Sequence, residues 1–236
     1  LIEFSDLLDE LLTASGIDGE AGQSRIRVEL ANYFAAATMM PYSPFLAAAE
    51  RNNYDLDRMA SDFDVSFEQV CHRLTTLGRE GARGIPFFFL RVDRAGNVTK
   101  RFNSTSFQLA EYGGACPVWN IHTAFSNPGV VVPQFVELPD GGRVFTISRT
   151  AHRPVFSQET QDRRLILALG CEVKHAHRIS YARGFETDGD GIFGRIGINC
   201  HLCPRQDCSQ RAHQPLLFEL PIDANRRGNS RYDVTG

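Results

Sequence analysis

The sequence predicts an α+β fold in which a helical N-terminal segment is followed by an antiparallel-sheet domain with a cysteine-rich metal loop. Apolar residues recur at helical spacing through residues 4–78. Beyond the glycine-rich stretch 78–86, apolar runs alternate with turn residues, as in β-hairpins. Three cysteines fall within residues 200–208, a density typical of metal sites. We therefore expect three parts, a helical segment, a sheet-rich domain and a polar tail, at residues 1–80, 81–220 and 221–236.

The helical segment contains four helix-like stretches, each bounded by a common start or stop signal. They cover residues 5–16, 24–41, 43–52 and 56–78. The first begins at Ser5 and ends on Gly16, and the second stops at Pro41. The third opens with a serine followed by Pro44, and proline is favoured at the first helical position. The fourth is interrupted before Ser66, which we expect to cap a separate helix.

The sheet-rich part contains two hairpin patterns and one further apolar run. Residues 85–102 form an apolar strand, a turn over 93–97 and a shorter return strand. Residues 130–150 repeat this plan around the turn residues 139–142. Residues 163–173 add one more apolar strand. Hairpin connections join neighbouring strands that run in opposite directions, so we expect an antiparallel sheet.

The composition is that of a soluble globular protein in a reducing compartment. Of the 236 residues, 42% are hydrophobic and 22% are charged, and the net charge of −3 does not suggest nucleic-acid binding by the whole chain. No apolar run approaches the length of a membrane span, and no signal peptide is recognisable. We therefore expect a cytoplasmic protein without membrane contact. The chain starts with leucine rather than methionine, so we also expect it to be part of a longer protein.

The three clustered cysteines have the spacing C-x2-C-x4-C and could supply three ligands from one loop. They are Cys200, Cys203 and Cys208. A fourth thiolate could come from Cys171 or Cys116, and we favour Cys171 because a strand end holds its side chain in a fixed direction. His201 and His213 are alternative fourth ligands if the metal is zinc.

Spacing favours an iron–sulfur cluster over zinc without excluding zinc. Structural zinc sites usually bring two short cysteine pairs, and this chain has one. Three close cysteines with one distant partner are more typical of a cubane cluster. Unligated buried thiols are the simplest alternative. A redox-active pair at Cys200 and Cys203 is disfavoured, because no thioredoxin-like βαβ pattern surrounds it.

Two local patterns resemble other protein classes but lack residues that those classes require. Residues 56–74 have the form of a helix-turn-helix, yet the stretch 51–80 carries four arginines against six acids, the wrong sign for a phosphate backbone. Residues 28–41 resemble the closing helix of ImmA/IrrE-type metallopeptidases, in which Glu29 would be a zinc ligand. Such enzymes need H-E-x-x-H, and none of the seven histidines lies in that pattern.

Four segments, taken in order, resemble the short-chain fatty acyl-CoA regulators, a family of transcription factors. These segments are residues 31–50, 67–101, 113–125 and 198–212. The resemblance implies an N-terminal helix-turn-helix domain outside this chain, then a degenerate peptidase-like helical segment, then this C-terminal region. It also implies a short acyl-CoA effector, with propionyl-CoA the leading candidate in propionate metabolism. A [4Fe–4S] cluster is further implied, on Cys171, Cys200, Cys203 and Cys208.

Aromatic residues and cations near strand ends suggest where an acyl-CoA would bind. An apolar slot with a basic rim suits a ligand that has an apolar end and phosphates at the other. We expect the acyl chain near Phe87, Phe89 and Trp119. The phosphates and adenine are expected on Lys100, Arg101, Arg149, His177 and Arg178. A cluster in the cysteine loop would brace one wall of this slot.

The favoured function is therefore a non-enzymatic acyl-CoA sensor domain that carries a [4Fe–4S] cluster. It would reach DNA only through the domain outside this chain, and it could form a homodimer. One alternative is a thioesterase or acyltransferase, with Cys116 or a histidine as nucleophile or base, although no Ser–His–Asp or Cys–His set stands out. A second alternative is a zinc-stabilised interaction module.

Overall fold

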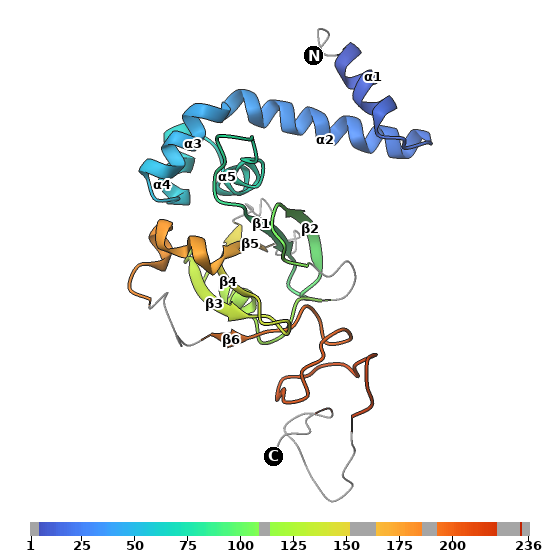
Figure 1. Ribbon diagram of the computed structural model, residues 1–236, viewed down its shortest axis with the longest axis vertical. Helices are drawn as coiled ribbons and strands as arrows, with labels where there is room; N and C mark the ends of the chain where they lie inside the picture. The colour runs from blue at the N-terminus through green and yellow to red at the C-terminus, as the bar shows by residue number, and fades with distance from the viewer. Residues whose placement is uncertain (1–4, 109–113, 152–163, 186–192, 221–231, 233–236) are drawn as a thin grey trace, which may run out of the picture.

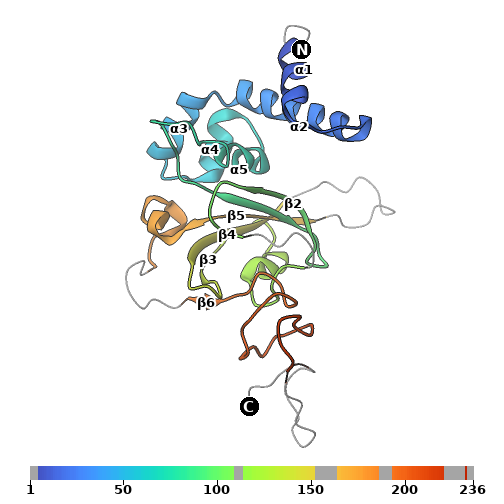
Figure 2. The ribbon, with the colours of Figure 1, turned by 45° about the vertical axis from the view of Figure 1, so that its right-hand side comes forward.

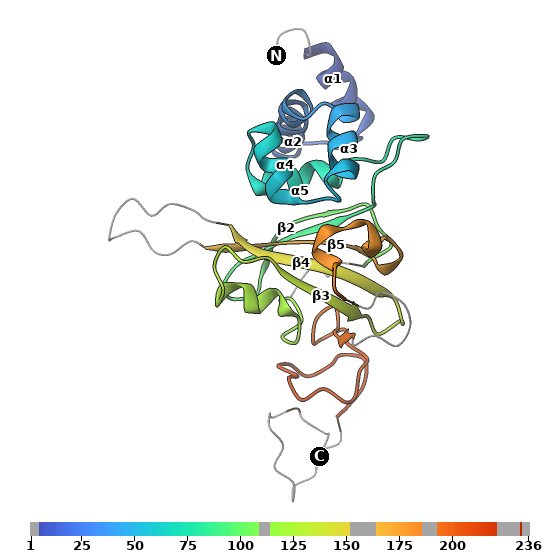
Figure 3. The ribbon, with the colours of Figure 1, turned by 90° about the vertical axis from the view of Figure 1, so that its left-hand side faces the viewer.

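The protein is built from three layers, with helices above a sheet and irregular structure below it (Figure 1). The computed structural model describes residues 5–108, 114–151, 164–185, 193–220 and 232. Figure 3 shows α2–α5 above the sheet, and a short helical turn and the C-terminal loop below it. Among the described residues, no helix combines the length and the apolar character needed to cross a membrane.

The N-terminal segment is helical, as the sequence predicts. Its helices are α1 Ser5–Ala14, α2 Glu20–Met39, α3 Tyr42–Arg51, α4 Leu56–Phe63 and α5 Phe67–Leu74. The predicted break between the last two helices is confirmed at Asp64, which has φ 50° and ends α4. The hydroxyl of Ser66 then accepts the backbone N–H of Gln69, whose side chain in turn accepts the Ser66 N–H. This capping box starts α5 at the predicted place.

The six-stranded sheet is mixed rather than purely antiparallel. Its strands are β1 Phe88–Val92, β2 Val98–Asn103, β3 Val132–Glu137, β4 Arg143–Ala151, β5 Leu165–Glu172 and β6 Gly194–Arg195. The order is β2-β1-β5-β4-β3-β6, and every pair is antiparallel except β3 with β6. The expectation of an antiparallel sheet therefore holds for five strands. The short β6 is not among the strands that the sequence predicts, and it pairs in parallel with β3.

Strand β5 is buried on both faces, which explains its nearly continuous apolar sequence. Leu167, Leu169 and Cys171 face the helices, where they join a core that also contains residues of α3, α4 and α5. Ile166 and Ala168 face the opposite side and pack in a second core with the 3-10 helix Asn120–Phe125. The first core contains residues of both the helices and the sheet. The predicted division of the chain at residues 80 and 220 stays a prediction.

Gly170 on β5 leaves room for an aromatic side chain that crosses the strand. A Cβ at Gly170 would lie 2.3 Å from Cζ of Phe88, closer than any real contact allows. The Phe88 ring in turn stacks on Phe107, with the ring centroids 4.3 Å apart. Glycine is therefore required here to let the β1 aromatic ring lie flat against β5.

We expect Gly170→Ala to destabilise the fold by about 1–3 kcal/mol, because Phe88 must leave its position. Urea unfolding followed by circular dichroism measures this change. Gly78→Ala is the matched control, since a Cβ at Gly78 meets no atom within 4 Å, and it should change the free energy of unfolding by less than about 1 kcal/mol. Equal stability of the two variants would contradict this account of the β1–β5 packing.

Candidate functional site

A cavity of about 600 Å³ lies between α2, α5 and β2. Figure 2 shows α2 passing above α5 and the β2 edge of the sheet. Ile26, Leu30 and Tyr33 on α2 line the cavity, opposite Phe102 on β2. None of the described side chains of α2 is buried, and Tyr33 is 50% exposed. The apolar side chains of α2 therefore border open space instead of closing a core, and a ligand with an apolar part fits there.

A smaller, polar cavity of about 290 Å³ continues from this one along β2. The two cavities share Arg25, Glu29, Lys100 and Phe102. Arg101 lines the polar one as well. The Lys100 ammonium lies 5.1 Å from the centre of the Phe102 ring, which holds it over the junction of the cavities. We call this polar cavity the mouth of the larger one. Its three cations, Arg25, Lys100 and Arg101, outnumber the single carboxylate of Glu29, and the resulting positive charge suits phosphate groups.

His72 on α5 contributes a half-buried imidazole to the apolar cavity. Its ring meets Phe89 and Phe102 edge-on, with centroid distances of 4.5 Å and 5.1 Å. Its Nε2 is buried and makes no hydrogen bond, although Oε1 of Glu68 lies 3.5 Å away. Burial, with smaller contributions from Lys100 and Arg91, lowers the pKa of His72 to about 4. The imidazole is therefore neutral at neutral pH.

Four thiols line a third, small cavity on the opposite side of the sheet. They are Cys116, Cys200, Cys203 and Cys208. Sγ of Cys116 accepts the Gly197 backbone N–H at 3.3 Å. A Cβ at Gly197 would lie only 2.7 Å from Sγ of Cys203, so glycine lets this backbone approach the thiols. Burial raises the pKa of Cys116, and Cys200 and Cys208 raise it further because they lie close by.

Two arginines fix the backbone of the cysteine loop to the edge of the sheet. Arg211 is only 2% exposed and donates to the carbonyl oxygens of Cys200 and Arg205. Arg205 donates to the carbonyl oxygens of Ile196 and Glu137 at 3.2 Å and 2.8 Å. Both guanidinium groups also line the thiol cavity. They can therefore hold the loop and offset negative charge on the sulfur atoms.

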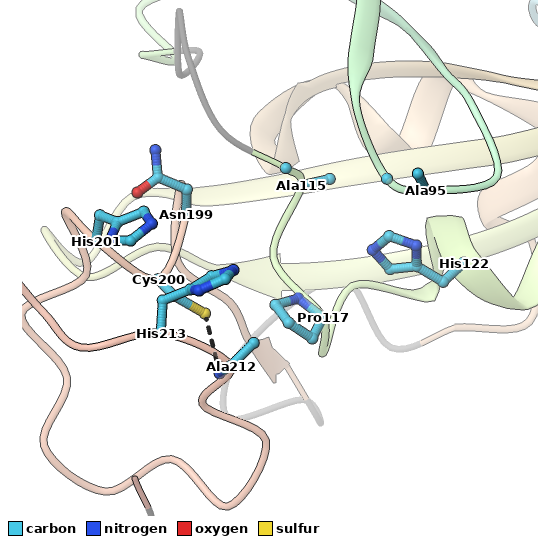
Figure 4. Close-up of a pocket in the computed structure, with 11 residues that line it drawn as sticks. Ala95, Ala115, Pro117, His122, Asn199, Cys200, His201, Ala212 and His213 are labelled. Carbon is cyan, nitrogen blue, oxygen red and sulfur yellow. Dashed lines mark hydrogen bonds between the residues drawn. The ribbon is translucent and has the colours of Figure 1, made fainter. Parts of the chain in front are cut away.

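A neighbouring cavity of about 310 Å³ places two histidines beside the cysteine loop (Figure 4). The rings of His201 and His213 stack with their centroids 4.7 Å apart. Figure 4 shows them next to Cys200, whose Sγ accepts the Ala212 N–H at 3.5 Å, with His122 across the cavity. Within the described parts of the chain, no three His, Cys, Asp or Glu side chains are close enough together to hold a metal ion as placed.

The choice of Cys171 as the fourth ligand does not agree with this geometry. Cys171 lies in the helix-facing core, where burial and then Glu172 raise its pKa to about 12. The loop cysteines lie beyond the other face of the sheet, near Ile196 of the second core. Side chains alternate across a strand, and Cys171 points away from the loop. Cys116, which sequence reasoning considered second, lines the thiol cavity with the three loop cysteines.

Of the eight residues expected to bind the acyl-CoA, two line the cavity pair. Lys100 and Arg101 lie at its polar mouth. Phe87 and Phe89 are buried in the helix-facing core, whereas Trp119 is buried below the sheet, so they do not form one slot. The cysteine loop is also on that lower side, and it does not brace the helix-lined cavity.

The other three expected ligand residues lie on the surface between the helices and the sheet. Arg149 forms an ion pair with Asp57 of α4, and Arg178 forms one with Glu50 of α3. His177 is exposed on the 3-10 helix Val173–Arg178. These arginines therefore fasten the helical layer to the sheet.

Sequence reasoning missed the charged residues that α2 and α5 bring to the cavity. These are Arg25, Glu29, His72 and Arg73. The available signal was a basic pair on the apolar side of α5, where Val70, Cys71 and Leu74 are buried beside Arg73. A charge within an apolar helix face indicates either a buried pair or a binding site.

The chain is similar to proteins named as regulators. Residues 76–232 match the family described as "Short-chain fatty acyl coenzyme A regulator, C-terminal", and residues 9–75 match the "IrrE N-terminal-like domain". The second match agrees with the expected peptidase-like helical segment.

Three relatives illustrate the similarity. The "Propionyl-CoA carboxylase regulator" of Cereibacter sphaeroides is 45% identical over 234 residues, which are 99% of this chain and 50% of that protein. The "HTH-type transcriptional regulator RamB" of Mycobacterium tuberculosis is 40% identical over 235 residues, 99% of this chain and 50% of that protein. The solved structure of a "Mycobacterium tuberculosis transcriptional regulator" superposes with a TM-score of 0.93 at 37% identity, covering 98% of this chain and 70% of that chain.

The chain thus spans about half the length of the curated relatives that it matches. Each of these relatives is named a regulator, which is consistent with the expectation of a chain that is not an enzyme.

We expect His72 to make stability depend on pH. Since its pKa of about 4 lies below the value near 6.5 of an unfolded histidine, the unfolded chain binds more protons between these values. Its contribution is fully present above pH 6.5 and is lost as the pH falls toward 4, with a total on the order of 3 kcal/mol. Urea midpoints measured across this window, for wild type and His72→Phe, isolate the effect.

The variant should lose stability less steeply than the wild type as the pH falls, because phenylalanine fits between the same rings and does not titrate. The exposed His177→Phe is the control and should retain the wild-type slope. Parallel curves for wild type and His72→Phe would show that His72 titrates normally.

Proposed function

Since this chain belongs to the short-chain fatty acyl-CoA regulators, we propose that it is the effector-binding part of a transcriptional regulator that senses a short-chain acyl-CoA. The observation that carries the proposal is the pair of joined cavities along α2 and β2. One is large and mostly apolar, and the other is polar and lined by cations. An acyl-CoA has the same division, with an acyl and pantetheine part at one end and phosphates at the other.

The cations at the polar mouth suit the phosphate end of this ligand. Arg25 lines it from α2, and Lys100 and Arg101 line it from β2. Arginine and lysine together can bind phosphate oxygens through charge-assisted hydrogen bonds. The apolar side chains Ile26, Leu30 and Phe102 then cover the pantetheine and acyl part. A ligand in this position touches both the helical layer and the sheet.

Propionyl-CoA is the first ester to test. One relative is named a propionyl-CoA carboxylase regulator, and short acyl groups suit a cavity of about 600 Å³ that must also take the pantetheine arm. The effector would act by binding two conformations of the protein unequally. The regulatory output would pass to DNA through a domain outside this chain, and a homodimer stays a prediction.

The thiol cavity is proposed to hold a [4Fe–4S] cluster on Cys116, Cys200, Cys203 and Cys208. Four soft sulfur donors around one space are the donor set that such a cluster requires. The guanidinium groups of Arg205 and Arg211 would offset the charge of the thiolates. When bound, a cubane cluster supplies a rigid cross-link and a one-electron redox centre. Zinc is the alternative metal, with His201 or His213, which line the neighbouring cavity together with Cys200, in place of one thiolate.

We expect Arg101→Ala and Lys100→Ala each to weaken propionyl-CoA binding about tenfold, because each removes a charged contact to phosphate. Isothermal titration calorimetry gives the dissociation constants. Arg58→Ala is the control, since its side chain is 68% exposed and lies away from both cavities. Unchanged affinity in both variants would remove the mouth from the binding site. If propionyl-CoA and other short acyl-CoA esters all fail to bind the wild type, the sensor proposal is wrong.

Protein purified without oxygen should be brown and contain about four irons per chain. Cys116→Ser should lose the visible absorption and most of the iron, because it removes a sulfur from the thiol cavity. Cys171→Ser is the matched control and should keep both, since Cys171 lies in the other core. Loss of iron in Cys171→Ser but not in Cys116→Ser would reverse this assignment. A colourless protein with one zinc would replace the cluster by a structural zinc site.

A further inference from the structure

Arg73 is a buried cation at the wall of the apolar cavity. It is 3% exposed, and it lies on α5 among the buried Val70, Cys71 and Leu74. It also lines the cavity formed with α2. A guanidinium group in such surroundings is normally paired with a carboxylate, because losing the hydration of its charge is costly.

The described contacts of Arg73 supply hydrogen bonds but no counter-charge. Its Nε donates to the Met40 carbonyl oxygen at 2.9 Å, which caps the C-terminal end of α2. One terminal nitrogen donates to Oγ1 of Thr76 at 3.1 Å. The rings of Tyr33 and Tyr42 lie 5.8 Å and 5.9 Å from its central carbon. Among the residues that the structure describes, no carboxylate forms an ion pair with Arg73.

A second cation makes the absence of a counter-charge more marked. The guanidinium group of Arg79 lies 4.2 Å from the centre of the same Tyr42 ring. Arg73 and Arg79 therefore share one aromatic partner. The ring and the helix end together offset only part of two positive charges. An anion bound inside the cavity would complete the site.

Arg73 lies toward the end of the cavity that is remote from the cationic mouth. The mouth is marked on α2 by Arg25, and Arg73 contacts α2 near Tyr33. These two positions are eight residues apart on one helix, or about 12 Å along its axis. The apolar side chains of Ile26 and Leu30 lie between them. The cavity thus offers positive charge at both ends with an apolar stretch in the middle.

We propose that Arg73 binds a carboxylate on the acyl group of the effector, so that the domain prefers a short carboxyacyl-CoA to the unsubstituted ester. The inference rests on the proposed function, because it assumes that the phosphates of a CoA ester occupy the mouth at Arg25, Lys100 and Arg101. The acyl end of the ligand then lies at Arg73. A planar guanidinium group matches a carboxylate in a two-point hydrogen bond. An acyl group without charge would leave the buried cation uncompensated.

The test compares two esters that differ by one carboxylate group on the acyl chain, propionyl-CoA and methylmalonyl-CoA, by isothermal titration calorimetry. The wild type should bind methylmalonyl-CoA at least about tenfold more tightly, as expected for one buried charged hydrogen-bonded pair. Arg73→Met should remove this preference, so that the variant binds the two esters with affinities within about threefold of each other. Arg79→Met is the matched control: it removes the other arginine of the Tyr42 ring, does not line the cavity, and should retain the preference.

The outcomes separate this inference from the proposed function. Equal affinity of the wild type for both esters, or tighter binding of propionyl-CoA, would overturn the role of Arg73 and leave the sensor proposal standing. If neither ester binds, the role of Arg73 is wrong, and if the other short acyl-CoA esters also fail to bind, the sensor proposal is wrong as well. If Arg73→Met does not fold, as judged by its circular dichroism and melting curve, Arg73→Lys is tested instead. It keeps the positive charge but loses the planar guanidinium group that makes the two-point hydrogen bond. That variant should then reduce the preference for methylmalonyl-CoA, and an unchanged preference would contradict the proposal.

Discussion

The alternation of side chains across β5 separates the two candidate sites of this protein. Leu167, Leu169 and Cys171 point to the helices, and Ile166 and Ala168 point to the lower layer. Both faces of the sheet are therefore covered, one by α2–α5 and the other by the 3-10 helix and the cysteine loop (Figure 3). The helix-lined cavity lies above this sheet and the thiol cavity lies below it. Any coupling between them must pass through the packed strands or between copies of the chain.

The helical layer is held to the sheet by a few charged contacts as well as by apolar packing. Arg149 pairs with Asp57, and Arg178 pairs with Glu50, each joining the sheet domain to a helix. Helix α2 is different, because none of its described side chains is buried and Arg73 holds its C-terminal end. A ligand that lies between α2 and β2 would add contacts where the protein itself makes few. This is the arrangement in which ligand binding can shift the position of a helix.

Both candidate sites offer positive charge to a negative partner, although the whole chain carries a net charge of −3. Arg25, Lys100 and Arg101 surround the polar mouth, and Arg205 and Arg211 border the thiols. Net charge averages over the surface and conceals such local groups. The cations at the mouth can stabilise the phosphates of a CoA ester above the sheet. The two arginines below the sheet can stabilise the negative charge of thiolates around a metal.

The sequence by itself determined the local elements and the family. Caps and breaks such as Ser66 and Asp64 depend on neighbouring residues only, and they predicted the break between α4 and α5 correctly. The hairpins were predictable for the same reason, and so was the family, because its segments are long and occur in order. The tertiary structure alone decided that Cys116 rather than Cys171 joins the loop cysteines, and that Arg73 lines a cavity. The physical reason is that these outcomes depend on which face of the sheet each distant segment covers. That is set by pairings such as β3 with β6, between strands more than fifty residues apart.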